Sequence, residues 1–171
     1  MNIALFGFMA VGKSSVGRIL AEKIGMIFID LDAKIEEAAG RAINEIFEAD
    51  GEEAFRSIER AVTREYAERD GQVIACGGGT VIDPENLECL RRSSTMILLS
   101  ATPEEIMRRV ETEDDTRPLL REGDKLGRIT SLLDRRKPAY MMVADYIVDT
   151  SGCTPGEVAE LIRDTIGGGL L

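Results

Sequence analysis

The fold of this chain is decided by the stretch Asn2-Ile3-Ala4-Leu5-Phe6-Gly7-Phe8-Met9-Ala10-Val11-Gly12-Lys13-Ser14. An apolar run is followed by two glycines that flank four residues, and then by Lys and Ser, which is the pattern of a phosphate-binding P-loop. Glycines let backbone N–H groups turn inward around an anion, and the helix that follows adds the positive end of its dipole. We expect Lys13 to reach the β- and γ-phosphates and the Ser14 hydroxyl to ligate Mg²⁺.

The alternative for this stretch is a strand–turn–helix corner whose glycines serve only the turn. The motif directly follows a short β-branched and aromatic run, which is the context that phosphate binding requires, so we favour the phosphate-binding interpretation. The loop residues expected to hold a nucleotide are Gly7, Ala10, Val11, Gly12, Lys13, Ser14 and Ser15.

Composition narrows the function classes. The 171 residues suffice for one domain, and the net charge of -10 argues against binding to nucleic acid or to an anionic membrane surface. The chain has no histidine, which excludes His-based catalysis and metal binding. Cys76, Cys89 and Cys153 follow no metal-ligand spacing. With no signal-peptide pattern and no long apolar run, we expect a cytoplasmic protein that acts as a monomer on a small molecule.

Short apolar runs alternate with amphipathic stretches along the whole chain, which predicts a parallel sheet covered by helices on both faces, an α/β/α sandwich. The predicted strands are 3–6, 26–29, 72–75, 95–99 and 146–148. The predicted helices are 13–24, 32–39, 43–49, 52–68, 84–91, 103–110, 125–142 and 155–166. In such a sheet, ligands bind at the carboxyl ends of the strands.

Two carboxylates follow the second predicted strand, Asp30 and Asp32. In one interpretation Asp32 only caps the next helix. In the other, one carboxylate supports Mg²⁺ through water and the other binds a substrate hydroxyl, and the residues alone leave open which does which. Ala75 and Cys76 stand where many P-loop enzymes carry a magnesium-binding Asp, which favours a metal role for Asp30.

Two further segments stand out. In 51–59, Arg56 and Glu59 could form an ordinary exposed ion pair on a helix, which by itself is the favoured interpretation. Gly77, Gly78 and Gly79 follow the third predicted strand directly. Three successive glycines exceed what a turn needs and indicate backbone N–H groups that a ligand approaches closely.

The segment 111–124 is polar, with only Leu119 and Leu120 apolar. A loop of this length in a small domain is commonly disordered or a functional lid. Arg117 and Arg121 favour a lid, because phosphoryl transfer needs cations that arrive on closure.

Taken together, these motifs resemble the shikimate kinase family, and the resemblance runs through nearly the whole chain. In chain order, the shared motifs are the P-loop, Asp-x-Asp at 30–32, Gly-Glu-x-x-Phe-Arg-x-x-Glu at 51–59, the three glycines at 77–79, Arg-Pro-Leu-Leu at 117–120, Arg-x-Pro-x-Tyr at 136–140, and Asp149 followed six residues later by Pro155. The resemblance implies a nucleoside-monophosphate-kinase-like fold, a single kinase domain with five parallel strands in the order 2-3-1-4-5, a substrate-binding region at about 32–60 and a lid at about 111–124.

The resemblance also implies a reaction, the ATP- and Mg²⁺-dependent phosphorylation of the 3-hydroxyl of shikimate on the way to chorismate. For the nucleotide, the resemblance implies ATP binding by Lys13 and the P-loop, Mg²⁺ binding by Ser14 and Asp30, and adenine contact by Arg109 and Pro155. For the acceptor, it implies that Asp32 binds the hydroxyl and accepts its proton, that Arg56 and Arg136 bind the carboxylate, and that Gly77, Gly78 and Gly79 contact the ring. It implies a lid cation at Arg117. Arg108 is adjacent to Arg109 and leaves the adenine assignment open. Cys76 departs from the hydroxyl residue that the family often has there.

Other functions stay open at this stage. The same scaffold could phosphorylate gluconate or a nucleoside monophosphate, although paired arginines with three glycines favour a compact carboxylated ring. A module that binds ATP without transferring phosphate is a further alternative, which the presence of Asp32 and Arg117 disfavours.

Overall fold

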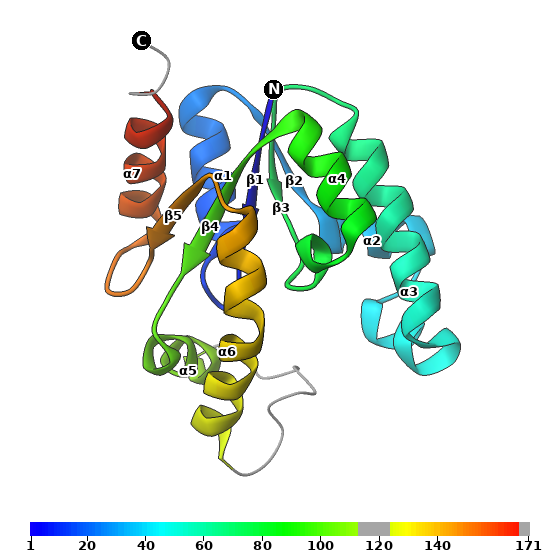
Figure 1. Ribbon diagram of the computed structural model, residues 1–171. Helices are drawn as coiled ribbons and strands as arrows, with labels where there is room; N and C mark the ends of the chain where they lie inside the picture. Colours follow the sequence, from blue (N-terminus) through cyan, green and yellow to red (C-terminus); the bar gives the residue numbers. More distant parts are fainter. Residues whose placement is uncertain (113–123, 168–171) are drawn as a thin grey trace.

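A five-stranded parallel sheet runs through the centre of the molecule in the order β2-β3-β1-β4-β5 (Figure 1). The computed structural model describes residues 1–112 and 124–167. The strands are β1 Asn2–Phe6, β2 Ile27–Asp30, β3 Gln72–Ala75, β4 Ser94–Ser100 and β5 Tyr146–Asp149. Every residue of β1 is buried, as expected for the central strand of a sheet covered on both faces.

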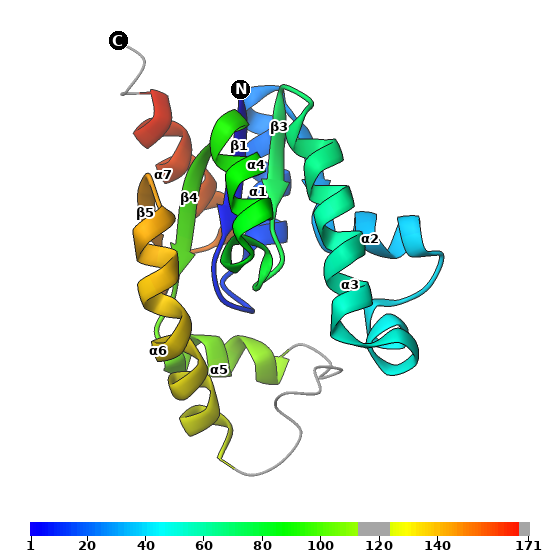
Figure 2. The ribbon, with the colours of Figure 1, turned by 45° about the vertical axis from the view of Figure 1, so that its right-hand side comes forward.

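Helices form a layer on each side of this sheet. They are α1 Lys13–Ile24, α2 Leu31–Ala39, α3 Ile43–Ala67, α4 Pro84–Ser93, α5 Pro103–Thr112, α6 Lys125–Val143 and α7 Pro155–Gly167, with a 3-10 turn η1 at Thr80–Ile82. Helices α1 and α7 pack together on one face, and α4 lies with α3 on the other (Figures 1 and 2). The carboxyl ends of the strands point toward the P-loop, η1 and the lower part of α6, so the loops that could hold ligands gather at that edge.

The predicted strands and their order are confirmed, with each boundary correct to within two residues. The helices expected at 43–49 and 52–68 are confirmed as two helical stretches within the element α3, divided at Gly51, which adopts the non-helical angles φ 83° and ψ 178°. One boundary needs correction. Glu111 and Thr112, expected in the polar loop, belong to α5, whose last turn is held by a bond from the Thr112 hydroxyl to the Arg109 carbonyl.

Residues 113–123 of the predicted lid, including Arg117 and Arg121, lie outside the described residues. Asp124 caps α6 by accepting a hydrogen bond from the Gly127 amide at 2.9 Å. Over residues 1–112 and 124–167, none of the helices combines the length and the apolarity needed to cross a membrane.

Candidate active site

The loop between β1 and α1 has the conformation that its glycines allow. Gly7 has a φ of 144°, and a Cβ there would collide with the carbonyl oxygen of Leu99. Gly12 has a φ of 97° and begins α1. Ala10 also has a positive φ, 57°, which costs a residue with a side chain about 1–2 kcal/mol. The chain therefore accepts strain to keep the loop in this shape.

Lys13 lies across the loop. Its ammonium donates to the carbonyl oxygens of Gly7 at 3.0 Å and Phe8 at 2.8 Å. These bonds hold a positive charge over the first turn of α1, where the unpaired N–H groups and the helix dipole also favour an anion. The arrangement suits the terminal phosphates of a nucleotide.

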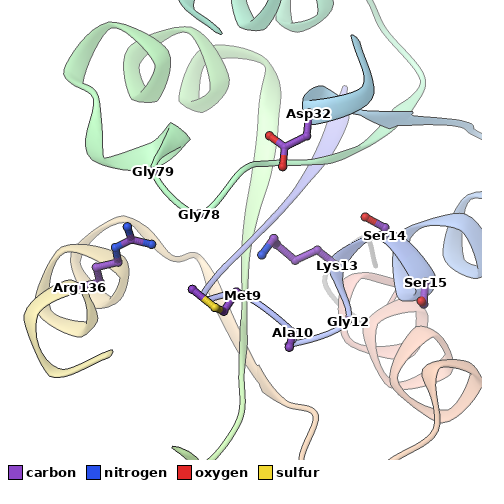
Figure 3. A pocket seen from close by; sticks show the side chains of 10 residues that line it. All are labelled: Met9, Ala10, Gly12, Lys13, Ser14, Ser15, Asp32, Gly78, Gly79 and Arg136. Atoms are coloured by element: carbon purple, nitrogen blue, oxygen red, sulfur yellow. The ribbon is translucent and has the colours of Figure 1, made fainter. Parts of the chain in front are cut away.

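A cleft of about 360 Å³ opens beside this loop (Figure 3). Its lining comes from four separate parts of the chain and comprises Met9, Ala10, Gly12, Lys13, Ser14, Ser15, Asp32, Gly78, Gly79 and Arg136. All but Met9 were predicted site residues. Met9 escaped prediction because an apolar side chain inside a phosphate loop carries no chemical signal of its own.

Asp30 and Asp32 have different surroundings despite their closeness in sequence. Asp30 is the N-cap of α2, since its Oδ1 accepts from the amides of Asp32 at 3.1 Å and Ala33 at 3.4 Å. Its Oδ2 accepts from the Ser14 hydroxyl at 2.6 Å. The interpretation in which Asp32 caps this helix is therefore wrong, because Asp30 occupies the capping position and leaves Asp32 directed into the cleft.

The Ser14 and Asp30 oxygens fit a magnesium site. Mg²⁺ prefers oxygen ligands and takes one or two from the protein, with water and phosphate completing its shell. The 2.6 Å contact places a hydroxyl and a carboxylate side by side at the start of α1. Larger clusters of acidic, Cys or His side chains able to hold a metal are absent from the described part of the chain, so a cage made of protein alone is not available there.

The Asp32 side chain is exposed to the open cleft, and its carboxylate lies against the glycine loop. A Cβ at Gly77 would lie only 2.7 Å from its Oδ1, so the glycine lets the carboxylate rest directly on the backbone. Burial and then the negative charge of Asp30 raise its pKa, and Lys13 partly opposes them. A carboxylate with a raised pKa is a better proton acceptor than an ordinary surface aspartate.

Arg56 is held by a buried partner. Its Nη1 donates to Glu59 Oε2 at 2.7 Å, and its Nη2 reaches Glu52 Oε1 at 3.4 Å. Glu59 is only 1% exposed and also accepts from the Thr80 hydroxyl at 2.8 Å. The ion pair that charge patterning favoured is therefore present, but its predicted exposure is wrong, because Glu59 is buried and also bonded to Thr80 of η1.

The three glycines lie between the two arginines. A Cβ at Gly78 would come within 3.0 Å of Arg136 Nη1, and one at Gly79 within 2.8 Å of Arg56 Nη2. The Arg136 guanidinium also lies over the ring of Phe8, 5.8 Å from its centre. Two guanidinium groups from α3 and α6 thus approach one bare stretch of backbone, an arrangement suited to a small ligand with a carboxylate.

Cys76 precedes the glycines and is fully enclosed. Burial raises the pKa of its thiol to about 12, so it stays neutral and serves as a small core residue.

A second cavity, of about 240 Å³, lies on the other side of the P-loop. Its lining includes the predicted nucleotide residues Val11, Arg109 and Pro155, together with Arg108 and Cys153. Arg109 connects the P-loop to the segment after β5. Its Nη1 donates to the Ala10 carbonyl at 3.1 Å and its Nη2 to the Thr150 carbonyl at 2.7 Å. Arg108 is exposed and pairs with Glu105. Of the two adjacent arginines, Arg109 is the one fixed inside this cavity.

These features define a class of protein. The protein is a P-loop kinase by its fold and its site. It has a parallel sheet in the order 2-3-1-4-5, a P-loop at the end of β1 and cavities on both sides of that loop.

Comparison with known proteins gives the family. The sequence model of shikimate kinases matches residues 9–167, so this chain belongs to the shikimate kinase family. The chain is 45% identical to a shikimate kinase of Caldanaerobacter subterraneus subsp. tengcongensis, with 93% of this chain and 92% of the relative covered. A shikimate kinase of Caldicellulosiruptor bescii is 41% identical, with 94% of this chain and 92% of that relative covered.

A solved structure shares the fold closely. The shikimate kinase of Acinetobacter baumannii in complex with shikimate superposes with a TM-score of 0.92 at 36% identity, covering 99% of this chain and 94% of that one.

Proposed function

We propose that this chain transfers the γ-phosphoryl group of ATP to the 3-hydroxyl of shikimate, giving shikimate 3-phosphate and ADP in the synthesis of chorismate. The observation that carries this proposal is the single cleft in which a P-loop lysine, a carboxylate with a raised pKa and an arginine beside bare glycines come together. Membership of the shikimate kinase family supports the same acceptor.

The two arginines bind the acid end of the substrate in this scheme. Arg56 and Arg136 pair with the shikimate carboxylate, and the forked guanidinium groups fix its plane. Glu59 already holds Arg56 in place, so little side-chain freedom is lost on binding. The ring then lies along Gly77, Gly78 and Gly79, where the lack of side chains leaves room for it.

Asp32 acts on the hydroxyl. As the 3-hydroxyl oxygen forms its bond to the γ-phosphorus, its proton passes to the Asp32 carboxylate, and the bond from the γ-phosphorus to the β–γ bridging oxygen breaks to release ADP. Lys13, held over the P-loop by the Gly7 and Phe8 carbonyls, balances the charge on the transferring group. Positioning and charge neutralisation carry the reaction, with no covalent intermediate on the protein.

Ser14 and Asp30 would hold Mg²⁺ beside the P-loop. When bound, this ion would neutralise part of the charge of the phosphate groups. We assign the adenine end of the nucleotide to the cavity lined by Val11, Arg109 and Pro155.

The role of Arg117 in this proposal rests on the sequence alone. Its Arg-Pro-Leu-Leu context suggests a lid at about 111–124 that brings a cation to the phosphoryl group, next to a substrate region at about 32–60 within one kinase domain. We further propose that the protein works as a monomer in the cytoplasm, where its three free cysteines would stay reduced.

An ADP-release assay tests the acceptor. Purified protein with ATP and Mg²⁺ is offered shikimate, quinate, gluconate or AMP at equal concentrations, and shikimate should be turned over fastest. Faster turnover of gluconate or AMP would assign the cleft to another kinase reaction. ATP binding without ADP release for any acceptor would indicate a nucleotide-sensing module.

A further inference from the structure

Tyr140 joins α6 to the glycine loop. Its side chain is 2% exposed, and its hydroxyl donates a hydrogen bond to the Gly78 carbonyl oxygen at 2.5 Å. The phenol ring packs edge-on against Phe6 of the central strand, with ring centres 5.9 Å apart. Tyr140 also follows Arg136 by one helical turn, so the same face of α6 carries a substrate-facing arginine and a contact to the substrate-facing backbone.

The bond to Gly78 orients the next peptide group as well. The Gly78 carbonyl and the Gly79 N–H belong to one planar trans peptide, so they point in opposite directions. With the carbonyl directed at Tyr140, the Gly79 N–H points away from it. No acceptor for this N–H occurs among the described residues, and Gly79 lines the cleft beside Arg56.

Glycines are the residues least able to hold such an orientation by themselves, because they lack a Cβ and rotate freely. Burial raises the pKa of the Tyr140 phenol, with the nearby Arg136 opposing it, so the hydroxyl stays protonated and remains a donor at neutral pH. The Phe6 contact fixes the ring from the other side. The phenol is therefore a rigid support anchored to the core.

We propose that Tyr140 is a positioning residue for acceptor binding, which holds the Gly78–Gly79 peptide so that the Gly79 N–H donates to an oxygen of the bound hydroxy acid. This inference rests on the proposed function, since it assumes that the glycine loop receives the acceptor. Tyr140 itself touches neither the acceptor nor the nucleotide.

The test is Tyr140→Phe, which keeps the ring and removes the hydroxyl. The KM for shikimate should rise about tenfold, equivalent to one lost hydrogen bond, while the KM for ATP and kcat change little. Tyr66→Phe and Tyr146→Phe are matched controls, because they remove a phenol hydroxyl away from the cleft. Both controls should keep the wild-type KM for shikimate. Incorporation of 4-aminophenylalanine at position 140 restores a donor and should restore the KM.

A measurement on the wild type covers the case in which Tyr140→Phe does not fold. The Gly79 amide proton resonance should move downfield when shikimate is added, because this N–H gains an acceptor. An unchanged KM for shikimate in folded Tyr140→Phe, or a Gly79 amide that does not respond in the wild type, overturns the inference. Failure of the proposed function looks different, since the wild type would then release no ADP with shikimate.

Discussion

Two aspartates separated by one residue show how position decides the role of a side chain. Asp30 uses one oxygen to cap α2 and the other to accept a hydrogen bond from the Ser14 hydroxyl. Asp32 lies two residues later and points into the cleft, where burial and the charge of Asp30 raise its pKa. The different contacts of the two carboxylates separate their roles, with Asp30 held by hydrogen bonds to the protein and Asp32 left to accept a proton.

Asp32→Asn should abolish most turnover. The amide keeps the shape of the carboxylate but cannot accept the proton of the hydroxyl, and loss of general-base catalysis lowers kcat by about 10²–10⁴-fold. Binding of ATP should stay near normal. The measurement is steady-state kinetics with shikimate, with a nucleotide titration as control. A variant that keeps more than about a tenth of the wild-type kcat would show that Asp32 is not the base.

The same variant should be more stable than the wild type at neutral pH. A raised carboxyl pKa means that the folded state binds more protons than the unfolded state between the usual value of 3.8 and the folded value. The free energy of unfolding therefore falls as the pH rises through this window, and ionised Asp32 costs stability above it. Asparagine removes that cost, so the Tm gain should be present at pH 7 and shrink toward pH 4. A constant Tm difference at both pH values would contradict the raised pKa.

Arg56 and Arg136 differ in how they are held. Arg56 pairs with a buried glutamate, whereas Arg136 lies over the Phe8 ring. Changing either to alanine should weaken shikimate binding, because truncating one partner of a desolvated charge pair costs about 2–5 kcal/mol. The double variant should lose less than the sum, since both arginines share one carboxylate.

Calorimetric titration with shikimate measures both effects. Arg60→Ala is a suitable control, because Arg60 lies one turn from Arg56 on α3 but pairs with Asp83 away from the cleft. ATP affinity should be unaffected in all three single variants. Wild-type shikimate affinity in both Arg56→Ala and Arg136→Ala would remove the two arginines from the site.

The sequence predicted the side chains that face a ligand, but it did not predict which buried residues hold them in place. Motif spacing identifies residues that meet a ligand, because the ligand's chemistry restricts their type. Glu59, Thr80 and Tyr140 meet only the protein, and whether such a residue is buried depends on which face of its helix packs inward. For Glu59, charge patterning favoured an exposed pair, since a charged residue on a helix most often faces solvent.

Among the elements, strands were easier to predict than the long helix. Each strand is a short apolar run that ends where polar or glycine residues begin, so its limits are visible in the sequence. Element α3 contains Gly51, whose non-helical backbone angles separate two amphipathic helical stretches across a kink. The predicted division at this point was therefore correct.

Gly51→Ala tests the importance of that break. A φ of 83° with a ψ of 178° is a region open essentially to glycine alone, so alanine should cost about 2–3 kcal/mol of unfolding free energy. Gly40→Ala is the matched control, because Gly40 also has a positive φ and an open Cβ position but adopts the left-handed angles φ 67° and ψ 18°. Alanine there should cost only about 1 kcal/mol.

Urea unfolding of the two variants gives the comparison. Equal losses at Gly51 and Gly40 would mean that α3 relaxes to a continuous helix at little cost. Because α3 carries Arg56, a larger effect at Gly51 should be accompanied by weaker shikimate binding in that variant only.

At the scale of the molecule, the site is assembled from segments far apart in the chain. The P-loop follows β1, the aspartates lie at the end of β2 and the start of α2, and the glycines follow β3 (Figure 1). Arg136 comes from α6 and lines the cleft (Figure 3), and Arg56 of α3 lies beside Gly79. Parallel topology explains the convergence, because all strand ends meet at one edge. The pattern of alternating strands and helices was enough to predict that ligands bind at this edge of the sheet. The depth of the cleft depends on side-chain packing, which the spacing of sequence motifs does not reveal.

A site assembled in this way should stabilise the whole fold when it is filled. A ligand that binds only the folded state at 100 times its Kd adds about 2.7 kcal/mol, and for a chain of this size about 1 kcal/mol raises Tm by about 2–4 °C. Saturating shikimate or ADP should therefore each raise Tm by about 5–10 °C.

In Arg56→Ala the shift with shikimate should fall to about a third or less, because the Kd rises at least about 30-fold. The shift with ADP should remain, since Arg56 lines neither the P-loop nor the cavity around Arg109. Thermal shifts of the wild type, Arg56→Ala and Arg60→Ala with each ligand provide the measurement. Loss of both shifts together in Arg56→Ala would mean that the two halves of the cleft form one coupled unit, against the separate acceptor and nucleotide sites described above.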